Sequence, residues 1–247
     1  MGKIDFKPGN MLYPLPAVLV TVRDRAGKDN VFTVAWAGTV CTNPPMLSIS
    51  VRPERHSYKA LHETGEFVVN LTGEEMVRAV DFCGVRSGRN MDKFACAGLA
   101  GEEARKVNAA SLRESPVNIE CRVREEIPLG SHHLFLADVV HVTVDEKYMD
   151  EKGTFHLDRA RPLVYSHGAY FAVGRSLGSF GFSVRKKRDD MRAGMPAGKK
   201  GSRGKISGRA GAKKRKTAGR PGRERKGGRT AGKGEKDRTE SGAGARG

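Results

Sequence analysis

Aromatic residues stop abruptly in this sequence: no Phe, Tyr or Trp follows Phe182, although 65 residues remain. Beyond that point Gly, Lys, Arg, Ala and Ser dominate. Such a segment cannot bury enough apolar surface to offset the entropy of ordering it. The earlier part contains the only Trp and all ten Phe residues, enough for one core. We therefore predict one folded domain at residues 1–183 and a disordered basic tail at residues 184–247.

Charge follows the same division. The chain has 45 Lys and Arg against 28 Asp and Glu, a net charge of +17 that by itself suggests nucleic-acid binding. The predicted tail contains 23 basic and 6 acidic residues, so the predicted domain contains 22 of each. A neutral domain has no general attraction for phosphate polymers. For the tail we expect weak, non-specific, salt-sensitive polyanion binding, and a solubilising extension without a partner explains it equally well.

Strict alternation marks one strand clearly. Apolar residues at positions 117, 119, 121 and 123 alternate with polar ones at 118, 120, 122 and 124, which predicts an antiparallel strand with one dry and one wet face. A turn at 127–130 leads to its hairpin partner at 134–144. Four earlier strands are predicted at residues 17–22, 31–40, 46–51 and 67–71. Six strands in this order suggest a mainly β fold, an antiparallel barrel.

Two short helices are predicted. One covers residues 57–63 and ends at Gly65, and the other starts with a capping box at Thr72 and Glu75 and reaches about residue 81. Neither is long enough for the repeated crossovers of a parallel, doubly wound sheet. A nucleotide-binding fold of that kind is therefore a poor match.

Cysteine spacing and hydropathy exclude several classes of protein. The four cysteines lie 42, 13 and 25 residues apart, so they form no CxxC pair or zinc-finger pattern. We expect neither a metal site nor a disulfide framework. No run approaches 18 apolar residues, and residues 1–10 contain no apolar core of a secretion signal. A cytoplasmic protein without membrane contact is the expectation.

An ordered set of short segments carries a resemblance to a known family. The segments are NVFTVAWAGT at 30–39, NPP at 43–45, SISVRPERHS at 48–57, TGEFVVNL at 64–71, DFCG at 81–84, SG at 87–88, DKF at 92–94, GSH at 130–132 and YSHG at 165–168. In order and content they resemble the flavin reductase-like family of FMN-binding split barrels, most closely its flavoredoxin-like branch, over about residues 10–185. The resemblance implies an antiparallel split barrel with short helices, and FMN as cofactor.

A flavin ring presents alternating hydrogen-bond donors and acceptors along one edge, which an exposed strand backbone can match. The small residues Ala35, Ala37 and Gly38 let the backbone approach closely, Thr33 offers a hydroxyl, and Trp36 is either a wall of the site or a core residue. An ordinary buried strand would explain this composition as well. The resemblance favours contact with the ring.

The FMN phosphate needs positive charge and several donors. Residues 50–57 run from a strand end into a helix N-terminus, where free N–H groups converge. Arg52 and Arg55 add forked guanidinium donors and Ser57 a hydroxyl. The alternative is that Ser57 only caps its helix and that the arginines are solvated.

The resemblance adds residues 87 and 93 on the phosphate side, although a solvated Lys93 is equally compatible with its charged loop. The predicted cofactor-binding residues are Thr33, Val34, Ala35, Trp36, Ser50, Val51, Arg52, Arg55, His56, Ser57, Ser87 and Lys93. His132 matches a family position beside the nicotinamide or the ring edge, so it is the candidate catalytic residue, and a structural histidine is the alternative. His133 points the other way if this stretch is extended.

The implied reaction is hydride transfer from NADH or NADPH to FMN, with electrons passed on to free flavin, oxygen or a protein acceptor. Because the cofactor carries this chemistry, the site needs no triad, carboxylate pair or metal. Two alternatives stay open: a non-catalytic FMN electron carrier, and a nucleic-acid-associated protein acting through its basic tail. A homodimer is implied by the resemblance alone.

Overall fold

A computed structural model describes residues 2–185, so Met1 and almost all of the predicted tail, with its expected disorder and polyanion binding, lie outside the described residues. The strands are β1 Leu15–Pro16, β2 Val18–Arg23, β3 Asp29–Val34, β4 Ala37–Cys41, β5 Met46–Val51, β6 Glu66–Asn70, β7 Gly101–Glu103, β8 Ala110–Leu112, β9 Val117–Pro128, β10 His133–Val144, β11 Leu163–Ser166 and β12 Ala169–Ala172. The α-helices are α1 His56–Thr64, α2 Val77–Val85 and α3 Lys93–Ala97. Single 3₁₀ turns are η1 Glu74–Met76, η2 Glu146–Tyr148, η3 Leu157–Ala160 and η4 Phe182–Val184.

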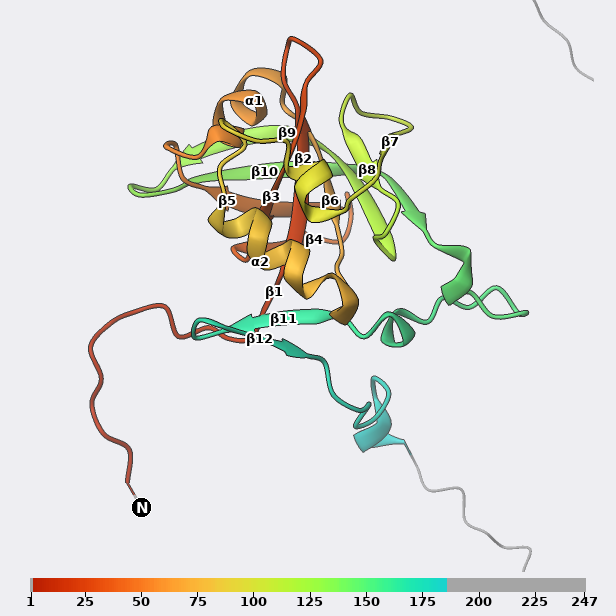
Figure 1. Ribbon diagram of the computed structural model, residues 1–247. Helices are drawn as coiled ribbons and strands as arrows, with labels where there is room; N and C mark the ends of the chain where they lie inside the picture. The colour runs from red at the N-terminus through yellow and green to blue at the C-terminus, as the bar shows by residue number, and fades with distance from the viewer. Residues whose placement is uncertain (1, 186–247) are drawn as a thin grey trace, which may run out of the picture. The chain divides into compact units, whose positions relative to one another are not determined.

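Seven antiparallel strands form the main sheet, in the order β3-β2-β6-β9-β10-β5-β4. Its two edge strands, β3 and β4, are consecutive in the chain and are joined only by Ala35 and Trp36. Three peptide links span at most about 11 Å, so the two edges of the sheet must come together and the sheet curls into a barrel. Figure 1 shows this barrel with α1 at one end and α2 along its side. We call the β3–β4 junction at Ala35 and Trp36 the seam.

The barrel is filled by alternate residues of its strands, as the period of two requires. Val18, Val20 and Val22 of β2 point inward, together with Phe67 of β6 and Phe135 of β10. Leu19, on the other face of β2, belongs to a second core outside the barrel, against α2 and β8. Burial on both faces explains why β2 reads as a nearly continuous apolar run.

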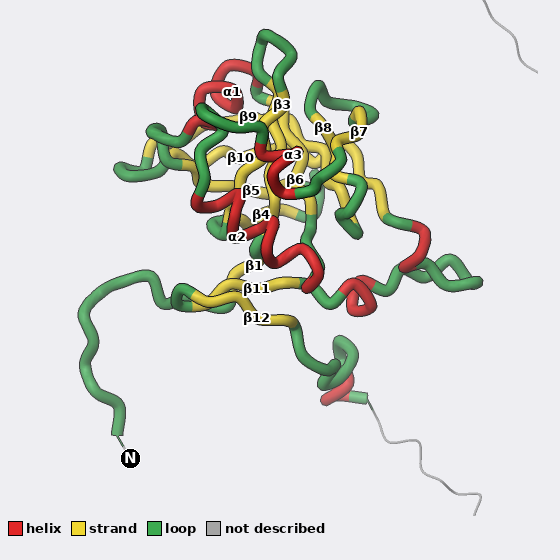
Figure 2. The backbone as a smooth tube through the Cα atoms, in the orientation of Figure 1, coloured by secondary structure: helices red, strands yellow, loops and turns green. Residues whose placement is uncertain are grey.

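A smaller sheet lies beside the barrel. Figure 2 shows β1, β11 and β12 as a separate three-stranded layer, and their order is β1-β11-β12. Tyr165 and Tyr170 of this layer pack against the second core. This arrangement brings Tyr165, from late in the chain, next to elements formed by the first hundred residues.

All six predicted strands are present, with two differences. The strand predicted at residues 31–40 is two strands, β3 and β4, because the seam separates them. The predicted wet face of β9 is also only partly wet, since Glu120 is fully buried. Its carboxylate accepts the backbone N–H groups of Arg105 and Lys106 at 3.0 and 2.6 Å, because the segment leading to β8 covers this face. These two hydrogen bonds offset part of the cost of burying the carboxylate.

The two predicted helices are also present, but their caps differ. Arg55, not Ser57, is the N-cap residue of α1, and Gly65 ends the helix in the left-handed conformation as expected. Thr72 donates its hydroxyl hydrogen bond to the carbonyl of Ala17 and does not cap the second helix, which begins as η1 and continues as α2 to Val85. No helix within residues 2–185 is long and apolar enough to cross a bilayer.

Candidate functional site

One cavity of about 610 Å³ collects every sequence-predicted site residue. It lies between the outer edge of β3, the end of β5, the start of α1, the end of α2 and the tip of the β9–β10 hairpin. Its lining includes Thr33, Val34, Ala35, Trp36, Ser50, Val51, Arg52, Arg55, His56, Ser57, Ser87, Lys93 and His132. The volume falls within the usual range for a small-molecule site.

The cavity runs along an open strand edge. Five consecutive residues from Phe32 to Trp36 line it. Successive side chains of a strand point to opposite faces, so a run of neighbours can line one cavity only if the cavity follows the edge. β3 pairs with β2 on its other side and is an edge strand of the main sheet. Ala35 keeps the approach open, whereas Ala37 and Gly38 belong to β4, pair with β5 and do not line the cavity.

Two side chains near the seam take specific positions. Thr33 donates its hydroxyl hydrogen bond to the carbonyl of Val80 in α2, so its proton already has an acceptor. Trp36 is 37 % exposed and therefore is not a core residue. Its ring lies parallel to that of His132, with 6.2 Å between centroids and 1° between planes. The backbone carbonyl of Trp36 accepts the N–H of Ser50 at 2.8 Å, which fixes the seam to β5.

The opposite end of the cavity is formed by the first turn of α1. Ser57 is 2 % exposed and its hydroxyl accepts a 2.6 Å hydrogen bond from Nδ2 of Asn30. No side chain caps the helix, because the N-cap residue Arg55 makes no such bond. The free N–H groups of this turn therefore meet the cavity, where they favour an anion. Arg55 instead donates to the carbonyl of Gly84 at 3.5 Å.

Lys93 is a buried cation, not a solvated one. It is 4 % exposed, and its Nζ donates to the carbonyl of Cys83 at 2.9 Å, in the last turn of α2. Burial lowers the pKa of Lys93, because desolvation disfavours the charged form. Burial likewise raises the pKa of the Cys83 thiol, which makes that cysteine unreactive. Burial deprives the Lys93 ammonium group of its interaction with water. An anion bound beside it would replace part of that interaction.

Positive charge is concentrated in this cavity although the domain as a whole is neutral. Five of its lining residues are cations and only Glu54 is an anion, which gives a formal net charge of +4. The cations are Arg52, Arg55, Arg86, Arg89 and Lys93. Glu54 pairs with Arg52 at 2.9 Å, which leaves four cations for a ligand. A ligand with two or more negative charges would match these four cations, which we call the cationic pole of the cavity.

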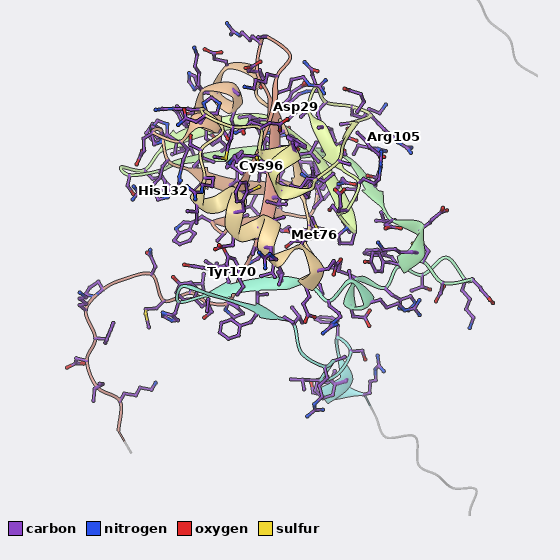
Figure 3. The ribbon with its side chains drawn as sticks, in the orientation of Figure 1. Asp29, Met76, Cys96, Arg105, His132 and Tyr170 are labelled. Carbon is purple, nitrogen blue, oxygen red and sulfur yellow. The ribbon has the colours of Figure 1, made fainter. Side chains whose placement is uncertain are left out.

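His132, which directly precedes β10, and His133, its first residue, face opposite sides, as extended backbone requires. His132 lines the cavity and its Nδ1 lies 2.9 Å from the Ser131 hydroxyl. Partial burial, followed by the charge of Arg52, lowers the pKa of His132, so the ring is neutral near pH 7. Nδ1 of His133 instead lies 2.6 Å from Oε1 of Glu126, outside the cavity. Figure 3 shows His132 on the opposite side of the domain from Arg105, which lies by the buried Glu120.

The chain matches a known family: the model of the flavin reductase like domain covers residues 11–174. The chain belongs to the flavin reductase-like family. Flavoredoxin of Desulfovibrio vulgaris (Miyazaki F) has the same fold with a TM-score of 0.70 and 30 % identity, covering 74 % of this chain and all of that one. Flavoredoxin from Methanosarcina acetivorans gives 0.67 and 26 %, covering 75 % and 100 %. An uncharacterized protein of Archaeoglobus fulgidus is 33 % identical over 141 residues, which are 57 % of this chain and 78 % of that protein.

These similarities confirm the predicted resemblance and the mainly β, antiparallel split-barrel fold. Several lining residues of this flavin reductase-like protein were nevertheless missed from its sequence. Asn30 was recognised only as the first residue of the 30–39 segment and was not assigned to the site. Arg86 and Arg89 flank the Ser87-Gly88 pair but were not assigned either. A basic residue on each side of Ser87 and Gly88 was the available signal. Tyr165 could be placed in the cavity only by the three-stranded layer, which the sequence analysis did not predict.

Proposed function

We propose that this flavin reductase-like chain binds FMN in the cavity along β3 and takes hydride from NADH or NADPH. The supporting observation is the combination of a strand edge at one end with a cationic pole at the other, within one cavity. The two ends of FMN match the two ends of the cavity. The flavin ring needs hydrogen-bond donors and acceptors, and the phosphate carries about two negative charges. The residues therefore fit this cofactor.

In this proposal the first turn of α1 and the buried Lys93 hold the phosphate. The turn contributes backbone N–H groups, and Lys93 and Arg55 contribute charge-assisted hydrogen bonds. Ser57 is held by Asn30 at 2.6 Å, which orients its hydroxyl before any ligand binds. A preorganised cradle loses less entropy on binding than a mobile one.

At the other end, the edge of β3 would hold the ring and the parallel pair of Trp36 and His132 would form one wall. Bound FMN supplies the hydride acceptor, so the protein needs no general acid or base of its own. A neutral His132 adds no charge beside an incoming nicotinamide, while its flat ring extends the surface on which a planar group can stack. His132 thus acts by positioning and excludes water from one side of the site.

An anaerobic stopped-flow experiment tests this function. Protein purified without added flavin is first titrated with FMN and the Kd is measured from fluorescence quenching. The FMN complex is then mixed with NADH or NADPH, and loss of the oxidised-flavin absorbance is followed. We expect FMN to bind and the absorbance to fall promptly with one of the two donors. Absence of FMN binding refutes the proposal, and FMN binding with bleaching only after a separate reductase is added assigns the chain to the electron carriers.

We also propose a homodimer as the working form. Large apolar side chains are exposed towards both ends of the described residues, among them Phe6 and Leu12 near the start and Phe171, Leu177 and Phe180 near the end. A second chain that covered these side chains would remove their apolar area from water. Sedimentation equilibrium over a hundredfold concentration range tests it, because a mass equal to one chain throughout excludes the dimer.

A further inference from the structure

A groove of about 600 Å³ lies between α2 and α3, outside the cavity described above. The two helices pack together beside β3, as Figure 2 shows. Phe82 of α2 and Ala97 of α3 also pack against the second core, so they form the floor. We call this hollow the α2–α3 groove, and its lining includes Arg78, Phe82, Val85, Arg86, Cys96 and Ala97.

The α2–α3 groove is open to solvent. Val85 is 71 % exposed, and the side chains of Arg78, Arg86 and Cys96 are exposed as well. A small-molecule site ordinarily buries most of the surface of its ligand, which so exposed a lining cannot do. An apolar centre between charged ends is instead the composition of a surface that binds another protein.

Each end of the groove has a cation without a carboxylate partner. Within residues 2–185, neither Arg78 nor Arg86 has a carboxylate oxygen within 4 Å of its side-chain nitrogens. Asp81 is the only acidic residue of the lining. Burial and, second, the charge of Asp81 raise the pKa of Tyr170, so this carboxylate lies beside the Tyr170 hydroxyl of the three-stranded layer. Uncompensated cations on an open surface favour an acidic partner.

The spacing of these residues indicates the form of the partner. Arg78 and Arg86 are eight residues apart, which places them about 12 Å apart along the helix axis. Phe82 and Val85 follow Arg78 by four and seven residues and therefore share its face of α2. A partner helix with two carboxylates about two turns apart and an apolar side chain between them has the complementary pattern.

Two other occupants have the wrong charge. The predicted tail of this chain has 23 basic and 6 acidic residues, so it would be repelled by the arginines of the groove. A second copy related by a two-fold axis would present the same face, and the cations of the two copies would meet. Like charges placed opposite each other suppress such pairings. An acidic protein other than this chain is the occupant that fits.

The groove adjoins the cavity proposed for FMN. Val85 and Arg86 line both hollows. A protein that fills the groove therefore lies at the rim of the flavin site without entering it. Trp36 and His132, which are proposed to meet the nicotinamide, line the cavity but not the groove, so the donor and the partner would have separate approaches.

We propose that the α2–α3 groove docks an acidic partner protein that accepts electrons from the bound flavin one at a time. This inference rests on the proposed function. One hydride brings two electrons to the flavin. Two oxidised partner molecules each take one electron and are reduced, the flavin returns to its oxidised form, and the proton passes to water.

The test uses one redox protein in two charge states. Cytochrome c is basic, and succinylation converts its lysine side chains to carboxylates while the haem is retained. The full chain is loaded with FMN and supplied with the nicotinamide donor under anaerobic conditions at 0.15 M salt. Reduction of each form of cytochrome c is followed from the haem absorbance over a range of its concentrations, which gives kcat/KM for each probe.

The variant is Arg78→Glu, which changes an exposed residue that lines the groove but not the FMN cavity. A glutamate is well tolerated in the first turn of a helix, so the fold should be kept. The matched control is Arg105→Glu, an exposed arginine outside both hollows that Figure 3 shows apart from Cys96. We expect kcat/KM for succinylated cytochrome c to fall about fivefold or more in Arg78→Glu and less than about twofold in the control. The unmodified, basic cytochrome c should not lose rate in either variant, and flavin bleaching by the donor should be unchanged.

The contrary results can be told apart. An unchanged rate with the succinylated probe in Arg78→Glu, or an equal fall in Arg105→Glu, overturns docking in the groove. Equal losses for both probes overturn the preference for an acidic partner. A rate that follows the concentration of added free FMN shows that diffusing flavin carries the electrons, which also overturns the inference. If the unaltered protein does not bind FMN, the proposed function fails too, whereas normal bleaching without reduction of either probe overturns this inference alone.

Discussion

Outside the cavity, we expect the largest loss of stability from substitution of Glu126 on β9. The side chain of Glu126 links α1 to the β9–β10 hairpin. Its carboxylate accepts hydrogen bonds from the Tyr58 hydroxyl at 2.7 Å and from Nδ1 of His62 and of His133 at 2.6 Å each. Tyr58 and His62 lie on α1, whereas His133 begins β10. The cluster thus fixes the helix that forms the phosphate end of the cavity to the hairpin that carries His132. We expect Glu126→Gln to destabilise the fold and to loosen that connection.

The magnitude follows from the pKa of Glu126. Burial raises that pKa, but the hydrogen bonds from Tyr58, His62 and His133 outweigh burial and lower it from its ordinary 4.5 to about 2. This difference corresponds to an upper value of about 3 kcal/mol, and partial solvation of the cluster brings the expected loss in Glu126→Gln to about 2 kcal/mol. Because the pKa is depressed in the folded state, the stabilisation is complete above pH 4.5 and is lost as the pH falls towards 2.

Urea unfolding at pH 5 and pH 3.5 checks both the size and the sign. Both pH values lie below the range in which imidazole side chains ordinarily titrate. The difference in unfolding free energy between the unaltered protein and Glu126→Gln should shrink by roughly two fifths between them. Glu125→Gln, on the exposed neighbour, is the control and should cost less than about 0.5 kcal/mol. A pH-independent difference, or an equal loss in the control, would refute the role assigned to the three hydrogen bonds.

Three further results are expected. Lys93→Met should raise the FMN Kd about 10- to 100-fold and leave riboflavin, which lacks the phosphate, within threefold; an equal loss for both ligands in fluorescence titrations would instead indicate a damaged fold. Gly88→Ala should lower stability by about 1–3 kcal/mol in urea unfolding and weaken FMN binding, because its Cβ would clash with Asn30, and wild-type behaviour would contradict that packing. Trp36→Leu should raise the KM for the nicotinamide donor up to about tenfold with little change in the FMN Kd, since it removes the partner of His132; the reverse pattern would place Trp36 against the flavin.

The sequence predicted the strands better than their ends. The alternation in β9 correctly placed Cys121 in the barrel core, because a regular strand has a fixed period. The same pattern misplaced Glu120, since the burial of its face depends on a loop that packs there from elsewhere in the chain. The break at Ala35 and Trp36 was missed for a related reason. Each half of residues 31–40 is a good strand, and only closure of the barrel requires a division between them.

The candidate site was predicted as a set of residues but not as a set of contacts. Resemblance brought together residues from five separate segments, and all of the predicted site residues line one cavity. It did not reveal that Lys93 is buried against Cys83, that Asn30 holds Ser57, or that Arg55 rather than Ser57 is the N-cap. Those facts depend on the distance between α2, β3 and α1 in space.

The seam has a consequence for how the protein behaves without its ligand. A fully closed barrel has no free strand edge, but here one edge of β3 faces a cavity instead of another strand. An uncovered strand edge is a template for pairing with a second chain. Whatever fills the cavity therefore also shields that edge, and a protein deprived of flavin exposes a starting point for aggregation. If the chain binds flavin as proposed, we expect cofactor supply to govern how much of the protein stays dispersed, in addition to how much of it is active.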